Sequence, residues 1–352
     1  MEQRQDWRPD RFDSFVGQKP ILQQLRLEVA SAKRAHRPLR HMLLAGPGGL
    51  GKNTLVSLLA AERGSPPPMV VMGATLTHET LSAALLGLES PGYNLRGNLM
   101  APDVARFPLL VVDECQKVPR ELLELLHPVL EPVDPEGRAI FTAKVRDPTN
   151  RWVTTPLWMV QSTFCFITNF AGEFEAQSPA TLTRIPLRLT FEWYDDSEMT
   201  AVVRQHAVHL KVKITDEAAE LLARRSNGMP RQAVHLLKRA IDFLTLADSD
   251  TIDRSLVNTL LDTVGIDENG LDRSMAKYLR VLGQSGSGKL GLQAIASVMG
   301  EDKLTIATSI EPVLMRRGLV VRASGGREIT PAGRVLLEGS AQRPSLLRSR
   351  AV

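Results

Sequence analysis

A glycine-rich stretch between Gly46 and Thr54 has the residue types needed to hold a triphosphate. It reads Gly-Pro-Gly-Gly-Leu-Gly-Lys-Asn-Thr. Glycines such as Gly49 and Gly51 let backbone N–H groups close around phosphate oxygens without a side chain in the way. A lysine in the place of Lys52 can reach the β- and γ-phosphates. The stretch therefore predicts an ATP-binding loop.

One residue of this loop departs from the usual pattern. Asn53 stands where Ser or Thr normally offers a hydroxyl to Mg²⁺. Its carbonyl oxygen could bind the ion, but at a different reach from the backbone, and Thr54 comes one residue too late to supply the hydroxyl. We expect nucleotide binding to persist through Lys52 and the loop amides. We expect hydrolysis to be slower, because placement of the metal stabilises the transition state.

Two adjacent carboxylates follow an apolar run further along the chain. Asp113 and Glu114 end the run Leu109–Val112. In an ATPase, the first carboxylate would hold Mg²⁺ through water and the second would orient and activate the attacking water. Alone, the pair could be a strand cap, but its position after the glycine-rich loop favours the catalytic interpretation. We predict Asn53 and Asp113 as metal ligands. The predicted catalytic residues in these two motifs are Lys52, Asp113 and Glu114.

The elements around these residues alternate between helix-like and strand-like patterns over the first 190 residues. Short apolar runs bounded by Gly, Pro or charged residues are typical of a parallel sheet covered on both faces. The glycine-rich loop then joins a strand to a helix, whose N-terminal dipole end favours phosphate. Strands are predicted at residues 41–45, 68–72, 109–112, 164–168 and 187–191, and helices at 21–35 and 52–62.

Beyond residue 190 the predicted secondary structure changes twice. Residues 195–262 are helical in pattern, with a break at 227–230. From Ile266, three helical patterns precede two strands around a Ser-Gly-Gly turn, which is typical of a winged helix-turn-helix. The predicted helices lie at 271–282, 291–299 and 303–316, and the strands at 319–322 and 328–330. The predicted domains are an α/β wound parallel sheet over 1–190, a helical domain over 191–262, a winged helix over 263–341 and a disordered tail over 342–352.

Composition and charge narrow the class of protein. Hydrophobic residues make up 43% and charged residues 23% of the chain, as in ordinary globular proteins. No apolar run approaches the ~18 residues that span a bilayer, and the N-terminus is too charged for a secretory signal. Cys115 and Cys165 lie in apolar runs, which predicts buried free thiols in a reducing compartment. We therefore expect a cytoplasmic protein with no membrane partner.

Positive charge collects toward the C-terminus. From Ile266 to Val352 there are 13 Lys and Arg against 8 Asp and Glu, whereas the whole chain has 43 against 39. A basic region of this kind can contact a polyanion such as DNA, although an ordinary solvated surface would have the same composition.

The motifs together resemble those of the RuvB family of AAA+ ATPases, ring motors for branch migration of Holliday junctions. The resemblance rests on Arg8-Pro9, Phe15–Gln18 and Leu44–Lys52, and it extends to Arg334. It implies an AAA+ P-loop NTPase fold with a helical lid and a C-terminal winged helix. It also implies a homo-oligomer, a hexameric ring, that acts with ATP and Mg²⁺ on four-way junction or duplex DNA.

One region departs most from this family. Residues 132–153 fall where the family carries a hairpin that docks RuvA. Residues 139–145 alternate like one arm of a hairpin. The region is nevertheless rich in Pro and charge, with few apolar residues to expose besides Ile140 and Phe141. A surface for a RuvA-type partner and a plain surface loop both stay open as interpretations.

The resemblance also implies which further residues surround the nucleotide. Arg8 and the segment Phe15–Gln18 would pack around adenine, and Tyr194 would lie near the nucleotide. Thr168 or Asn169 would be the sensor-1 residue that contacts the γ-phosphate, although either could simply cap a strand.

Four arginines receive roles from the same resemblance. Arg184 would be the arginine finger that reaches across a subunit boundary to the neighbour's phosphate. Leu182 stands where the family usually has another arginine close to it. Arg231 would project from the sensor-2 turn of the lid toward the phosphates. Arg322 and Arg327 flank the wing turn and would contact DNA phosphates.

The leading hypothesis is an ATP-dependent helicase or translocase that drives branch migration in DNA recombination and repair. The alternative is a RuvB-like paralogue that binds ATP as a switch, with weak or no hydrolysis, and acts as a DNA-binding loader or scaffold. Asn53, Leu182 and the divergent hairpin region favour that alternative. A DNA-binding regulator whose ATPase module controls assembly is a third hypothesis. The intact Asp113 and Glu114 favour the motor.

Overall fold

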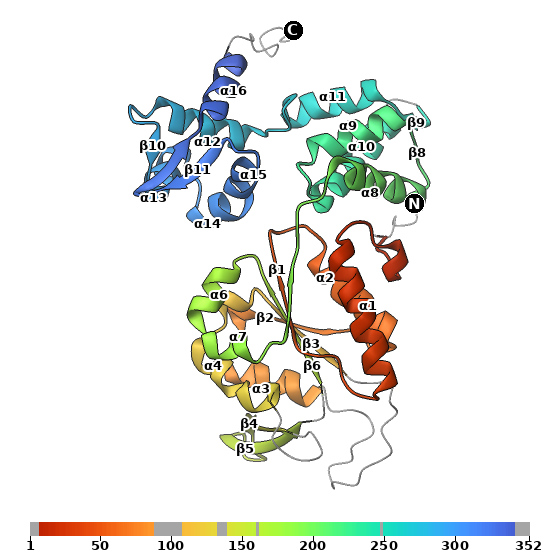
Figure 1. Cartoon of the computed structure of the whole chain (residues 1–352), viewed down its shortest axis with the longest axis vertical. Helices are drawn as coiled ribbons and strands as arrows, with labels where there is room; N and C mark the ends of the chain where they lie inside the picture. Colours follow the sequence, from red (N-terminus) through yellow and green to blue (C-terminus); the bar gives the residue numbers. More distant parts are fainter. Residues whose placement is uncertain (1–6, 88–107, 132–138, 160–161, 247–248, 342–352) are drawn as a thin grey trace. The chain divides into compact units, whose positions relative to one another are not determined.

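The structure is a computed structural model of the chain (Figure 1). It describes residues 7–87, 108–131, 139–159, 162–246 and 249–341. The predicted tail, 342–352, lies outside the described residues, as does the first part of the region expected to dock a partner. The chain forms two compact units, which divide between Tyr194 and Asp195.

A five-stranded parallel sheet forms the centre of the first unit. Its spatial order is β2-β3-β6-β1-β7, and all neighbouring strands run parallel. Every residue of β1 and β6 is buried, because central strands of a parallel sheet are covered on both faces. The predicted wound parallel sheet is confirmed. The strands are β1 (Met42–Ala45), β2 (Met69–Met72), β3 (Leu109–Asp113), β6 (Thr163–Thr168) and β7 (Leu187–Thr190).

Helices cover both faces of this sheet. Figure 1 shows α1 and α2 on one side of the strands and α3, α4, α6 and α7 on the other. The core on the second side contains a row of stacked aromatic rings, in which Phe166 stacks on Phe164 and Phe174. The helices are α1 (Lys19–Arg34), α2 (Lys52–Arg63), α3 (His78–Gly87), α4 (Arg120–Leu125), α5 (His127–Leu130), α6 (Ala171–Gln177) and α7 (Pro179–Thr183), with 3₁₀ turns η1 (Phe12–Ser14), η2 (Gly73–Thr75) and η3 (Cys115–Lys117).

An antiparallel hairpin of β4 (Ala139–Arg146) and β5 (Trp152–Met159) is inserted between β3 and β6. Its first arm confirms the prediction for residues 139–145. The expectation that Phe141 is exposed is wrong: it is fully buried in the core, because β4 packs against α3. Ile140 is exposed, as predicted, and Trp152 and Val153 are also exposed among the hairpin side chains that the structure describes.

The second unit begins with a helical part. Asp195, Thr215 and Asp253 cap three of its helices by accepting backbone N–H bonds. The predicted break is confirmed, since Asn227 and Gly228 adopt positive φ and Pro230 then begins α10. The elements are α8 (Asp196–His209), β8 (Lys213–Ile214), α9 (Asp216–Arg225), α10 (Pro230–Leu246), β9 (Thr251–Ile252) and α11 (Arg254–Val264).

The remainder of the second unit is a winged helix-turn-helix. The predicted helix over 303–316 is interrupted by a π turn, because Pro312 lacks the N–H of a regular α-helical bond. The final helix, α16, was not predicted. The elements are α12 (Arg273–Gln284), β10 (Lys289–Leu290), α13 (Leu292–Met299), α14 (Lys303–Thr305), the π turn η4 (Ile306–Ile310), α15 (Glu311–Arg316), β11 (Val320–Ala323), β12 (Gly326–Ile329) and α16 (Pro331–Ala341).

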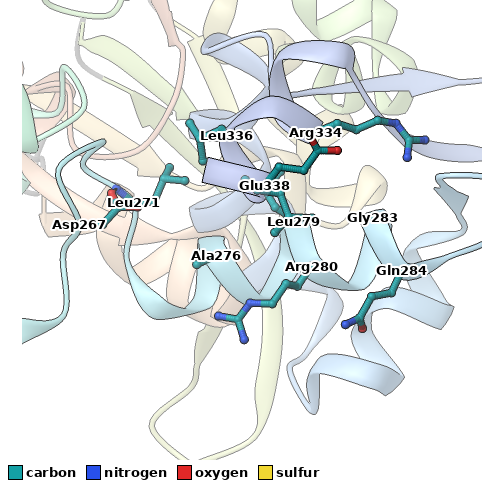
Figure 2. Close-up of a pocket in the computed structure, with 11 residues that line it drawn as sticks. Asp267, Leu271, Ala276, Leu279, Arg280, Gly283, Gln284, Arg334, Leu336 and Glu338 are labelled. Carbon is teal, nitrogen blue, oxygen red and sulfur yellow. The ribbon is translucent and has the colours of Figure 1, made fainter. Parts of the chain in front are cut away.

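A pocket lies between α12 and α16 (Figure 2). Its walls include the apolar side chains of Leu279 and Leu336, and Arg280 and Arg334 also line it. The pocket contains none of the residues that the sequence predicts for a functional site. The predicted nucleotide motifs lie instead at the ends of the parallel strands.

Candidate active site

The strand order brings the predicted motifs to one edge of the sheet. The glycine-rich loop follows β1, the pair Asp113–Glu114 ends β3, and Asn169 follows β6. Strand β6 lies between β1 and β3. The carboxyl ends of parallel strands meet at the same edge, which is where ligands bind in open α/β sheets.

The glycine-rich loop has a backbone that only glycine adopts readily. Gly46, Gly49 and Gly51 all have positive φ values, of 138°, 82° and 96°. A Cβ at Gly46 would lie 2.8 Å from the carbonyl oxygen of Phe191, and one at Gly51 would lie 3.0 Å from the Phe15 ring. The loop is thus a close-fitting cradle at the N-terminus of α2, as phosphate binding requires.

Lys52 ties this loop to the end of β6. Its side chain is buried, and Nζ donates to the carbonyl oxygens of Gly46 at 2.6 Å and Pro47 at 2.8 Å. Nζ also donates to Oδ1 of Asn169 at 2.9 Å. The ammonium group and the Asn169 amide therefore lie together beside the loop, where a terminal phosphate would be contacted.

The other sensor candidate, Thr168, faces elsewhere. Its hydroxyl donates to Oε1 of Gln116 at 2.8 Å and accepts the backbone N–H of Phe170. The side chain is buried. Of the two residues, the geometry favours Asn169 for phosphate contact, while Thr168 fixes the turn after β3 to the end of β6.

Asn53 and Asp113 are brought into direct contact. Nδ2 of Asn53 donates to Oδ2 of Asp113 at 2.9 Å, and the backbone N–H of Glu114 donates to Oδ1 at 2.9 Å. Each carboxylate oxygen of Asp113 thus already accepts an N–H. Mg²⁺ requires oxygen ligands, whereas Asn53 turns its nitrogen toward Asp113. In this arrangement the predicted ligand pair does not fit the ion.

The predicted water-activating carboxylate, Glu114, pairs with a residue that the sequence did not single out. Oε2 of Glu114 lies 2.8 Å from Nζ of Lys117, and both side chains are about one-third exposed. Glu114 has a positive φ of 52°, which turns the chain sharply into η3. The three-residue spacing on such a turn was the only available sign of the pair.

The segment expected near adenine packs against the same loop. Phe15 touches Gly51, and the ring of Tyr194 lies against Gly17. Gln18 fixes the segment to the chain after β7 through two hydrogen bonds with the backbone of Glu192. These residues form one wall beside the loop. Arg8, in contrast, is exposed.

The predicted arginine finger has different neighbours. Arg184 follows α7, where NH1 donates to the carbonyl oxygen of Ala180 at 2.7 Å and Nε lies 3.0 Å from the Glu131 carboxylate. Burial of His127 lowers its pKa, and the positive charge of Arg184 lowers it further. These contacts do not join Arg184 to Lys52. A role at a neighbouring subunit's phosphate stays a prediction.

The remaining predicted residues belong to the second unit. Arg231 is exposed in the first turn of α10. Arg327 is only 19% exposed and makes a two-pronged ion pair with the buried Glu311, at 2.7 and 3.2 Å. Arg322 is 62% exposed and lies 3.5 Å from the same carboxylate. Arg322 is therefore the more accessible of the two wing arginines.

The described residues provide neither a metal-binding cluster nor a helix that could span a membrane. They contain no group of three His, Cys, Asp or Glu that could hold a metal ion. None of their helices has the length and apolar composition that crossing a bilayer requires. Both cysteines are buried free thiols, as predicted.

A parallel sheet of this order, with a phosphate loop after β1 and an acidic pair ending β3, defines the chain as an AAA+ P-loop ATPase. The chain belongs to the RuvB family. Family models for the "Holliday junction DNA helicase RuvB P-loop domain", the "RuvB AAA lid domain" and the "RuvB C-terminal winged helix domain" match residues 7–135, 194–267 and 268–338.

Individual relatives are similar to this protein along nearly the whole chain. The Holliday junction branch migration complex subunit RuvB of Ligilactobacillus salivarius is 33% identical, with 93% of this chain and 90% of the relative covered. The RuvB of Rubrobacter xylanophilus is also 33% identical, at 92% and 84%. The solved RuvB branch migration motor of Thermotoga maritima has a TM-score of 0.77 and 28% identity, covering 94% of this chain and 98% of that one.

Proposed function

We propose that this chain is the ATP-driven motor subunit of a ring that moves Holliday junction DNA. The observation that carries the proposal is a pair of contacts beside the loop. Lys52 donates to Asn169, and Asn53 donates to Asp113, at the ends of three adjacent strands. The chain belongs to the RuvB family. The relatives with this architecture are branch migration subunits. A hexameric ring in the cytoplasm is the assembly we propose.

The residues of the site divide the work as follows. Lys52 leaves the loop carbonyls to bind the β- and γ-phosphates, and Asn169 contacts the γ-phosphate. Glu114 orients the attacking water once it separates from Lys117. Arg184 of one subunit stabilises charge on the phosphate bound to its neighbour. Mg²⁺ is the ion expected for such an ATPase, but Asn53 and Asp113 do not present oxygens to it together.

The contacts to DNA and to a partner lie outside this site. Arg322 at the wing is exposed and suited to a DNA phosphate contact. Ile140 and Trp152 are exposed and lie on the same face of the β4–β5 hairpin, which supports docking of a RuvA-type partner.

The test is branch migration of a synthetic four-way junction by the purified chain, with and without a RuvA protein. We expect junction dissociation that requires ATP and is lost in Lys52→Ala. Arg120→Ala, which removes an exposed charge on α4, serves as the matched control and should behave like the wild type. Failure of the wild type to bind ATP, or an active Lys52→Ala, would contradict the proposal.

A further inference from the structure

The contact between Asn53 and Asp113 changes which ligands the nucleotide site offers to a metal ion. At the usual Ser or Thr, a hydroxyl can donate to the carboxylate while its oxygen lone pairs still face a cation. An amide nitrogen has no lone pair to offer. Nδ2 of Asn53 donates to Asp113 at 2.9 Å, so the side-chain oxygen of Asn53 points away from the carboxylate.

Turning the Asn53 amide over would admit a cation only at the cost of the hydrogen bond to Asp113. The amide oxygen would then face a carboxylate oxygen of Asp113, and two oxygens repel unless a cation lies between them. The charge-assisted hydrogen bond to Asp113 would also be lost. Admitting Mg²⁺ to this position therefore carries a cost that a Ser or Thr would not impose.

The amide can also take over part of the ion's effect. Asp113 is a negative charge beside the place where a triphosphate would lie, and Nδ2 of Asn53 already neutralises part of it. The amide carries a second N–H, which can donate to a phosphate oxygen. Asn53 is exposed, in the first turn of α2, directly after Lys52.

We propose that Asn53 makes nucleotide binding by this chain nearly independent of Mg²⁺. The Asn53 amide takes the place of the ion as the partner of Asp113. Thr in its place would make tight binding depend on the ion. The inference rests on the proposed ATP site and specifies how that site holds its ligand.

The test is the affinity of the full-length chain for a fluorescent, non-hydrolysable ATP analogue, measured in Mg²⁺ and in EDTA. For the wild type we expect the two Kd values to agree within about threefold. For Asn53→Thr we expect Mg²⁺ to tighten binding by about tenfold or more, the scale of a charge-assisted hydrogen bond. Arg120→Ala, which removes an exposed charge on α4, is the matched control and should keep the wild-type pattern.

A second variant covers the case in which Asn53→Thr fails to fold. Asn53→Ala removes the donor without supplying a metal ligand, so it should weaken binding in EDTA by about tenfold. A wild type whose affinity falls tenfold in EDTA, or an Asn53→Ala that binds as the wild type does in EDTA, would overturn the inference. A wild type that binds no analogue under either condition would instead overturn the proposed ATP site.

Discussion

At the scale of single residues, the ion pair between Glu114 and Lys117 bears directly on catalysis. While Oε2 of Glu114 is held by the Lys117 ammonium group at 2.8 Å, that oxygen is occupied and cannot orient a water. In the proposed mechanism, Glu114 must therefore separate from Lys117 before hydrolysis.

We predict that Lys117→Ala raises ATP hydrolysis in the absence of DNA. The expected increase is about twofold to fivefold, because ion pairs of this exposure contribute about 0.2–1 kcal/mol. The measurement is steady-state phosphate release. Arg120→Ala breaks the pair with Glu124 on the next helix and should leave the rate unchanged. A rate in Lys117→Ala at or below that of the wild type would show that the pair does not restrain Glu114.

His41 gives a prediction for pH. Burial lowers the pKa of His41 from 6.5 to about 4, and its Nδ1 accepts the backbone N–H of Phe164 at 3.1 Å. Above pH 6.5 the ring is neutral in both states. As the pH falls from 6.5 toward 4, the unfolded chain binds a proton that the folded chain refuses, so stability is lost.

Between pH 7 and pH 5 we expect the free energy of unfolding of the first unit to fall by about 1–2 kcal/mol. The measurement is urea denaturation, followed through the transition of the first unit. His41→Asn keeps an acceptor for Phe164 but cannot titrate, and its stability should fall less over the same interval. Equal losses in the two proteins would contradict the assignment.

The residue scale is also where sequence reasoning was weakest. The glycine-rich loop, Asp113 and Glu114 could be located from residue types and spacing alone. The pairing of Asn53 with Asp113 could not, because it joins side chains from two elements whose approach depends on the packed sheet. Lys117 was missed because a lysine on a short turn looks like ordinary surface.

At the scale of elements, buried strands were predictable because apolar runs bounded by turns leave few alternatives. The β5 arm was missed, since Pro156 and two threonines blur its alternation. Helix α16 was missed because Pro331 and Gly333 read as a loop. The structure shows that Pro331 is a helix start and that Gly333 permits close packing.

Gly333 lies directly against the backbone carbonyl oxygen of Leu319, so a Cβ there would force α16 away from the wing. We predict that Gly333→Ala destabilises the second unit by about 1–3 kcal/mol. The measurement is chemical denaturation followed by circular dichroism. In Gly172→Ala, on α6, a Cβ meets nothing within 4 Å, so the change should be neutral or slightly stabilising. Equal effects of the two substitutions would contradict the packing argument.

At the scale of the whole molecule, the proposed ring requires that each ATP be shared by two subunits. Lys52 and Arg184 have separate sets of contacts within one chain, which suits residues that serve different nucleotides. The family membership that supports this ring could be predicted from the sequence, because its motifs extend over most of the chain.

We predict that Lys52→Ala and Arg184→Ala each reduce the rate of ATP hydrolysis by about a thousandfold or more. An arginine finger typically contributes a factor of this size to kcat. Mixed together, the two variants should recover hydrolysis, because Arg184 of a Lys52→Ala subunit can complete the loop of an Arg184→Ala neighbour. The measurement is phosphate release as a function of mixing ratio. Activity no greater than the sum of the separate variants would argue that Arg184 acts within its own chain.

The division between Tyr194 and Asp195 leaves no spacer between the units. Tyr194 is buried against Gly17 in the first unit, and Asp195 already caps α8 in the second. The peptide bond between these two residues is therefore the direct link between the units. A substitution at either residue would loosen an end of that link, because each side chain is already fixed within its own unit.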